Sequence, residues 1–294
     1  YENFSSNTTS RTRAYLKIQD GCNNFCSYCL IPFIRGRSRS RSLADIVSEV
    51  ESLSLTNSEI VLTGINMSDY KIDDKLALGE VLKALSSLKS RIRIGSLEVN
   101  VITDEFLKIC SQMPNFCPQF HLSMQSGCDR ILSLMNRHYT KDEYLEKVSL
   151  IRQYFPDASI TTDVIVGFPT ETEEDFLETI DTINKAKFFK MHIFPYSLRA
   201  GTKASRMAQV NGNVKKERVK RLEEIDAKLH DEYLKQMKGK EQTVLIETIN
   251  SEYAEGYTEN YIKVYLSVAQ KEYHIGDMVK IKVGEKFKDG VMPA

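Results

Sequence analysis

The stretch Gly21-Cys22-Asn23-Asn24-Phe25-Cys26-Ser27-Tyr28-Cys29 places three cysteines within eight residues. It directly follows residues 14–19, where apolar and polar side chains alternate as in a half-buried strand. Three thiolates on one tight loop can each bind one iron of a [4Fe-4S] cluster and leave a fourth iron open to another ligand. Spacing alone leaves two alternatives open. One is a zinc site with His121 or Cys128 as the fourth ligand, and the other is three ordinary thiols.

Strand and helix patterns alternate from this stretch to about residue 196. Strands are expected at 14–19, 60–62, 92–98, 120–124, 160–166 and 188–194, and helices at 43–53, 81–88, 129–135, 140–154 and 172–186, with a short helix starting at Thr103. Parallel strands need helical crossovers, so the pattern predicts an α/β fold with a parallel sheet or partial barrel. Ligands of such sheets collect at the carboxyl ends of the strands, where the cysteine stretch lies.

The pattern changes beyond a long polar helix expected at 214–237. Short apolar runs at 244–246, 261–264 and 278–283 are separated by glycines, which predicts a small β-barrel. We therefore expect two domains, residues 8–236 and residues 237–294.

Composition restricts the classes of function. Forty Lys and Arg balance forty Asp and Glu among the 294 residues, so a nucleic-acid partner must be argued from local clusters. Hydrophobic residues make up 41%, enough for a core. No run reaches the ~18 apolar residues of a membrane span, and residues 1–4 do not resemble a signal peptide. Six cysteines in so long a chain do not form a secreted disulfide framework, so we expect a cytoplasmic protein.

The cysteine stretch and several segments after it resemble the radical S-adenosylmethionine (SAM) superfamily and, within it, the methylthiotransferases. The segments that carry this resemblance are 21–29, 35–41, 125–129, 135–140, 163–173, 194–202 and 255–261. The Arg-Gly-Arg-Ser-Arg-Ser-Arg run at 35–41 is most similar to the enzymes that act on N6-threonylcarbamoyladenosine in tRNA. Residues 255–261 resemble a TRAM domain, a small RNA-binding β-barrel. The implied fold is a partial (β/α)6 radical SAM barrel followed by a TRAM barrel.

The resemblance implies two cofactors and their ligands. Cys22, Cys26 and Cys29 would bind a [4Fe-4S] cluster whose open iron is chelated by SAM, and an electron from an external donor would cleave SAM to a 5′-deoxyadenosyl radical. Thr63 and Gly64 match the position that contacts the SAM amino group. Seven further residues are candidates for contact with SAM, namely Ser96, Glu98, Gln125, Ser126, Asp163, Val164 and Gly167. For each of them a purely structural role is the alternative.

Local clusters provide the argument for RNA. The alternating arginines can offer planar bidentate donors to tRNA phosphates or to the SAM carboxylate, with a solvated loop as the alternative; they are Arg35, Arg37, Arg39 and Arg41. Tyrosines of the tail could stack on unpaired bases, although strands favour tyrosine in any case; they are Tyr253, Tyr257, Tyr261 and Tyr265. The expected partner is the anticodon region of tRNA. We expect the protein to be a monomer and not to bind a membrane.

The reaction implied by the resemblance replaces the C2 hydrogen of the modified adenosine with a methylthio group. Family members carry an N-terminal domain with three more cysteines for an auxiliary [4Fe-4S] cluster that delivers sulfur. Only 21 residues precede Cys22, so we expect this chain to lack that domain and not to complete the reaction. The alternatives are the isopentenyladenosine enzyme, an enzyme for a ribosomal-protein aspartate, and a non-catalytic zinc-bearing RNA-binding module.

Overall fold

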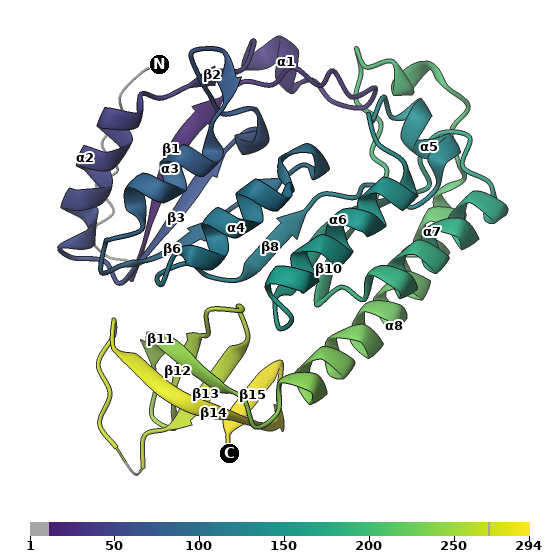
Figure 1. The fold of residues 1–294 in the computed structure, drawn as a ribbon. Helices are drawn as coiled ribbons and strands as arrows, with labels where there is room; N and C mark the ends of the chain where they lie inside the picture. The colour runs from purple at the N-terminus through teal and green to yellow at the C-terminus, as the bar shows by residue number, and fades with distance from the viewer. Residues whose placement is uncertain (1–11, 270) are drawn as a thin grey trace.

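The structure is a computed structural model that describes residues 12–269 and 271–294. The expected domain start at residue 8 and the N-terminal residues 1–4 lie outside the described residues. Six strand positions form one curved, parallel sheet (Figure 1): β1 (Arg13–Asp20), β3 (Glu59–Gly64), β6 (Arg91–Ile94) continued by β7 (Ser96–Leu97), β8 (Gln119–Leu122), β9 (Ser159–Val166) and β10 (Lys190–Pro195).

The sheet follows chain order and confirms the predicted partial (β/α)6 barrel. Its halves pair as β2-β1-β3-β6 and β10-β9-β8-β7, and an isolated parallel bridge between Ile92 and Phe116 joins them. The break between the halves falls at Gly95, where a β-carbon would lie 3.3 Å from the Leu62 carbonyl oxygen. Only the short edge strand β2 (Arg39–Ser40) runs antiparallel to its neighbour.

Helices cover the outer face of this sheet (Figure 1). They are α2 (Leu43–Ser54), α3 (Leu78–Leu85), α4 (Asp104–Gln112), α5 (Asp129–Leu134), α6 (Lys141–Tyr154), α7 (Glu173–Ala186) and α8 (Gly212–Met237). The predicted start signals act as N-caps: the Ser42 hydroxyl accepts from the Asp45 N–H, and Thr140 forms a capping box with Glu143. The four-residue helix α1 (Ile31–Ile34) and the hairpin β4 (Lys71–Ile72) to β5 (Lys75–Leu76) were not predicted.

The alternation that predicted the first strand also explains the core. Ala14, Leu16 and Ile18 face outward from the barrel and are at most 1% exposed, in the same core as Ile46 and Val50 of α2. Full burial of one such side chain stabilises the fold by roughly 1.5–3 kcal/mol. The intervening residues face the barrel interior. Successive residues of the strand therefore alternate between the outer core and the inner cavity.

The C-terminal residues form the predicted small β-barrel. Its closed order is β11-β12-β13-β15-β14, and its strands are β11 (Glu241–Ile249), β12 (Tyr253–Tyr257), β13 (Lys263–Ser267), β14 (Met278–Phe287) and β15 (Gly290–Pro293). Val244, Ile246 and Val264 belong to a second core, which also includes Tyr233 and Met237 of α8. The sequence did not predict β12 and β15, because glycines and polar residues interrupt their apolar patterns.

A buried ionic cluster connects this β-barrel to the amino ends of the parallel strands. The Glu59 carboxylate, fully buried at the start of β3, contacts Arg13 at 2.6 Å, Arg91 at 2.5 Å and Arg93 at 3.0 Å. Arg91 also donates to the Thr243 carbonyl at 3.0 Å, and Arg93 to carbonyls of residues 258–259. Burial alone would raise the pKa of Glu59, but the guanidinium groups outweigh it and lower the pKa to about 2.

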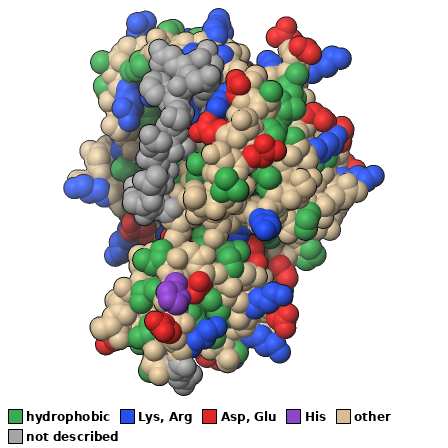
Figure 2. Space-filling model, turned by 90° about the vertical axis from the view of Figure 1, so that its left-hand side faces the viewer, with side chains coloured by type: hydrophobic (Ala, Val, Ile, Leu, Met, Phe, Trp, Pro, Cys, Tyr) green, Lys and Arg blue, Asp and Glu red, His purple; other side chains and the backbone are tan. Residues whose placement is uncertain are grey.

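No helix in the described part of the chain is long and apolar enough to cross a membrane. One face of the molecule carries basic and acidic side chains interspersed (Figure 2). This distribution agrees with the balanced formal charge of the sequence.

Candidate functional site

The cysteine loop lies at the carboxyl end of β1, at the opposite end of the sheet from the β-barrel (Figure 1). The loop begins at Gly21, whose φ of +73° suits glycine and whose hypothetical β-carbon would lie 2.1 Å from the Arg37 carbonyl oxygen. The Cys22 N–H donates to the Gly36 carbonyl at 3.2 Å. The close approach of two backbone segments at Gly21 therefore fixes the start of the loop.

The end of α5 supports the same loop from the other side. Ser27 donates through its N–H to the Met135 carbonyl at 2.9 Å and through its hydroxyl to the Leu134 carbonyl at 2.7 Å. The Asn136 amide donates to the carbonyls of Asn24 and Phe25 at 3.0 and 3.1 Å. This role of Asn136 was not predicted, since nothing in its local pattern points to a loop more than 100 positions away.

Each cysteine sulfur accepts a hydrogen bond. The Asn24 N–H lies 3.5 Å from Cys22 Sγ, the Ile31 N–H 3.4 Å from Cys29 Sγ, and the Arg137 guanidinium 3.5 Å from Cys26 Sγ. Such donors stabilise thiolate ligands and tune iron–sulfur clusters. Burial raises the pKa of the free Cys22 and Cys29 thiols, so metal binding at these residues releases protons.

The donor set fits a cluster better than a zinc ion. Two sulfurs bound to one zinc at about 2.3 Å cannot be more than about 4.6 Å apart. Among the described residues, the three thiols do not form a group whose ligand atoms all lie within 4.8 Å. Neither suggested fourth ligand is grouped with the loop thiols: Cys128 is buried and donates to Asp175 at 3.2 Å, and His121 lies beside Asp163 and His192 inside the barrel. Three spread thiolates suit a cluster in which each binds a different iron.

Cys29 borders a cavity of about 510 Å³ at the carboxyl ends of β8, β9 and β10. Two of the predicted SAM-contacting residues, Gln125 and Asp163, line it together with Tyr28 and Phe194. Gln125 has a φ of +65° and exchanges backbone hydrogen bonds with Asp163 and Ile165 at 2.8 and 2.9 Å. The volume suits a small-molecule cofactor.

Glu98 borders the cysteine loop at a second, smaller cavity of about 120 Å³. Its carboxylate accepts from the Asn24 amide at 3.1 Å and from the Arg137 guanidinium at 2.6 Å. Arg137 therefore bridges the Glu98 carboxylate and Cys26 Sγ, a role that the sequence did not reveal. Ser96 lines a different cavity inside the barrel, because β7 ends at Leu97 and the chain turns there.

Thr63 and Gly64 are half-buried at the carboxyl end of β3. A β-carbon at Gly64 would lie 2.9 Å from the Met67 side chain and 3.1 Å from Gln19. The glycine therefore allows close packing between β3 and β1. Thr63 and Gly64 lie at the carboxyl end of the sheet, where the cysteine loop also lies.

Three further predicted SAM-contacting residues have partners within the protein. The buried Ser126 hydroxyl accepts from the Cys128 N–H at 3.2 Å, and the Val164 side chain is fully buried in the core. The Gly167 N–H donates to Glu171 at 2.6 Å, and a β-carbon on Gly167 would lie 2.4 Å from the Lys215 side chain. Contact of these residues with SAM, which for Val164 and Gly167 would be made by the backbone, stays a prediction.

The four arginines of the 35–41 run have different environments. Arg41 is buried and contacts Glu49 at 2.5 Å, so its guanidinium is already paired, and its contact with RNA or SAM stays a prediction. Arg39 pairs with Asp20 at 2.9 Å. Arg35 is exposed, and the exposed Arg37 lies 4.6 Å from the centre of the Phe25 ring. Only Arg35 and Arg37 are therefore without a carboxylate partner among the described residues of this run.

The tail tyrosines contact each other and nearby cations. Tyr257 and Tyr261 stack with their centroids 4.7 Å apart, and the Arg13 guanidinium lies about 5 Å from both rings. Tyr253 and Tyr265 form an edge contact at 5.8 Å. These rings already contact other groups of the protein. The four tyrosines therefore do not all present a free face on which a base could stack.

Comparisons with known proteins agree with this site. Residues 16–183 match the Radical SAM superfamily. The threonylcarbamoyladenosine tRNA methylthiotransferase MtaB of Bacillus subtilis is 40% identical over 96% of this chain and 65% of its own length. The enzyme of the same name from Thermotoga maritima is 37% identical over 99% of this chain and 68% of its own length. The chain belongs to the radical SAM methylthiotransferase family.

Other members of this family are similar as well. The tRNA-2-methylthio-N(6)-dimethylallyladenosine synthase of Thermoanaerobacter sp. is 42% identical over 82% of this chain and 52% of its own length. The chain thus spans 52% to 68% of the length of these three relatives. Membership of the radical SAM family implies a [4Fe-4S] cluster and SAM, and the cysteine loop supplies residues that fit the cluster.

Solved structures of radical SAM enzymes share the fold. The methyltransferase TsrM from Kitasatospora setae aligns with a TM-score of 0.57 and 17% identity, over 67% of this chain and 38% of its own. Coproporphyrinogen III oxidase from Escherichia coli aligns with a TM-score of 0.55 and 15% identity, over 76% and 54%. At these identities the likeness shows the partial barrel alone.

Proposed function

We propose that this radical SAM methylthiotransferase acts on tRNA and introduces a methylthio group at C2 of N6-threonylcarbamoyladenosine next to the anticodon. The observation that carries the proposal is the three-cysteine loop, with a donor on every sulfur, beside a 510 Å³ cavity in a chain 40% identical to an enzyme of that name. The auxiliary [4Fe-4S] cluster that supplies sulfur belongs to the full-length enzyme in this proposal.

The residues of this chain have distinct tasks in the proposed reaction. Cys22, Cys26 and Cys29 hold the cluster, which together with SAM supplies the one-electron chemistry that removes the C2 hydrogen. Arg137 neutralises part of the negative charge that the thiolates and Glu98 bring to the loop. Gln125 borders the SAM cavity, with Asp163 next to it.

The remaining candidates form the outer parts of the site. Thr63 and Gly64 would approach SAM from β3. Arg35 and Arg37 would contact tRNA phosphates at the rim, because both guanidinium groups are exposed near the loop. We divide the chain into a radical SAM unit, residues 8–236, and a TRAM-like RNA-binding unit, residues 237–294. In this proposal the protein is a cytoplasmic monomer that receives electrons from an external donor.

Nucleoside mass spectrometry tests the proposal directly. Cells that lack the full-length gene are complemented with the wild-type gene, with Cys26→Ala, or with the matched control Cys110→Ala, whose thiol is buried in α4 away from the loop. We expect wild type and control to restore 2-methylthio-N6-threonylcarbamoyladenosine, and Cys26→Ala to leave the unthiolated nucleoside. Restoration by Cys26→Ala would contradict the role of the loop.

Similarity to the dimethylallyladenosine enzyme supports a second candidate substrate. That relative is 42% identical over 82% of this chain. If the isopentenyl nucleoside changes in the same experiment and the threonylcarbamoyl nucleoside does not, the reaction class stands and the substrate moves to this alternative. If neither nucleoside changes, a tRNA substrate is wrong.

A further inference from the structure

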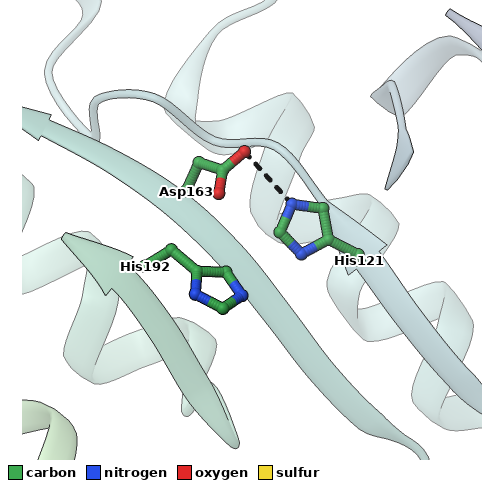
Figure 3. A group of neighbouring side chains, drawn as sticks. All are labelled: His121, Asp163 and His192. Carbon is green, nitrogen blue, oxygen red and sulfur yellow. Dashed lines mark hydrogen bonds and ion pairs between the residues drawn. The ribbon is translucent and has the colours of Figure 1, made fainter. Parts of the chain in front are cut away.

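Three side chains on adjacent strands meet inside the partial barrel, and one of them, Asp163, also lines the cavity that Cys29 borders. His121 lies on β8, Asp163 on β9 and His192 on β10, and one ligand atom from each lies within 4.8 Å of the other two. Figure 3 shows the three side chains directed toward one another. We propose that they bind one divalent transition metal ion, with Zn²⁺ and Fe²⁺ as the matching ions.

The distances suit a single ion. His121 Nε2 lies 3.2 Å from Asp163 Oδ2. Metal–nitrogen and metal–oxygen bonds of about 2.1 Å place two ligands of a tetrahedral zinc roughly 3.4 Å apart. An ion can therefore be bound here by small movements of the side chains, and two imidazoles with one carboxylate form a ligand set known for zinc and for non-haem iron.

The surroundings of His121 orient it as metal-binding histidines usually are. Its Nδ1 lies 3.0 Å from the Thr161 hydroxyl, which also accepts from the Gln119 amide at 3.3 Å. A hydrogen bond at one ring nitrogen fixes the tautomer and aims the other nitrogen at the metal. When Nδ1 carries the proton, the lone pair of Nε2 faces the Asp163 carboxylate, and a cation between them removes the repulsion.

His192 distinguishes this cluster from an ordinary hydrogen-bonded pair. No local pattern in the sequence indicates a function for His192, and a buried structural histidine usually has hydrogen-bonded ring nitrogens. In the described part of the chain, the His192 imidazole has no hydrogen bond to another protein group, and its ring lies 5.6 Å from that of His121. Its side chain is exposed to a cavity of about 600 Å³ inside the barrel. A free imidazole next to a carboxylate and a second imidazole is what a metal would require.

The ligand types and the cavity are compatible with a bound metal. Neutral imidazole and ionised carboxylate are the forms that ligate metals. Because the cavity adjoins the cluster, remaining coordination positions would be open to water or to an oxygen atom of a substrate.

Zinc binding can be measured without interference from the cysteines. The untagged chain with Cys22, Cys26 and Cys29 all changed to alanine is titrated with zinc sulfate by calorimetry, and bound metal is counted by mass spectrometry after dialysis. We expect about one zinc per chain, and at least a tenfold lower affinity after His192→Ala. The same increment of one zinc is expected for the wild-type chain carrying its iron–sulfur cluster.

His230→Ala is the matched control, because His230 lines the same cavity but donates through Nδ1 to the Phe189 carbonyl instead. This variant should retain zinc, and zinc should raise its midpoint of thermal unfolding but not that of His192→Ala. If His192→Ala does not unfold cooperatively, Asp163→Asn replaces it at nearly unchanged size. Absence of bound zinc, or equal affinity in the His192 and His230 variants, would overturn the proposal.

Discussion

Replacement of Glu59 by glutamine should strongly destabilise the protein. The carboxylate is fully buried and is the shared partner of Arg13, Arg91 and Arg93. Arg13 has a second partner, Glu247, at 2.5 Å, whereas Arg91 and Arg93 have no other carboxylate among the described residues. Glu59→Gln therefore leaves two buried guanidinium groups without a counter-charge at the contact between sheet and β-barrel.

Two independent estimates of the cost agree. Removal of one partner from a buried ion pair typically costs about 3–5 kcal/mol. The pKa of Glu59 falls from an ordinary 4.5 to about 2, and at 1.36 kcal/mol per pKa unit this corresponds to about 3 kcal/mol. Since the pKa is lowered on folding, this stabilisation is present above pH 4.5 and is lost as the pH falls from about 4.5 toward 2.

Urea unfolding followed by tyrosine fluorescence measures the effect, since the chain has 14 tyrosines and no tryptophan. Glu59→Gln should lower the free energy of unfolding by about 3 kcal/mol at pH 7, and its stability should vary less than that of wild type below pH 4.5. Glu247→Gln, which removes the more exposed partner of Arg13 alone, should cost about 1 kcal/mol or less. Equal losses in the two variants would refute the reasoning.

The cysteine loop gives further predictions. Gly21→Ala should greatly reduce iron retention measured by absorbance and iron analysis, because the new β-carbon would clash with the Arg37 carbonyl; retention equal to wild type would show that the backbone can shift. Arg137→Met should lower both iron retention and stability, the latter by about 3 kcal/mol, because Glu98 and Cys26 lose a shared cation; Lys at this position should restore part of the loss. Arg35→Ala together with Arg37→Ala should weaken tRNA binding and reduce its salt dependence while melting temperature stays unchanged, and an unchanged salt slope would argue against phosphate contacts.

Local patterns were enough to predict most of the fold. The strand at 14–19, the N-cap of α2 and the capping box of α6 depend on short-range periodicity and on hydrogen bonds within one turn. The cluster loop could be located because its ligands are close in sequence. By contrast, β12 contains Glu255 and Gly256, and its pairing depends on closure of the β-barrel rather than on its own pattern.

Side-chain partners that the local pattern does not specify explain what could not be predicted from the sequence. Arg41 has the same local pattern as Arg35 and Arg37, but Glu49 of the following helix buries it. Arg137 and Asn136 acquire their roles from a loop more than 100 residues earlier. Gly167 fits a backbone-contact motif, yet a glutamate four residues later occupies its N–H. In each case the deciding partner is set by tertiary structure.

The β-barrel and the cysteine loop occupy opposite ends of the same strands. A strand of eight residues such as β1 is about 26 Å long at roughly 3.3 Å per residue. Any ligand that touches both ends must therefore extend for at least that distance, far beyond the size of one nucleotide. The Glu59 cluster holds the β-barrel at this distance from the cysteine loop. If the ligand is RNA, as proposed, a folded RNA is long enough to contact both ends at once, whereas a free nucleoside can contact only one.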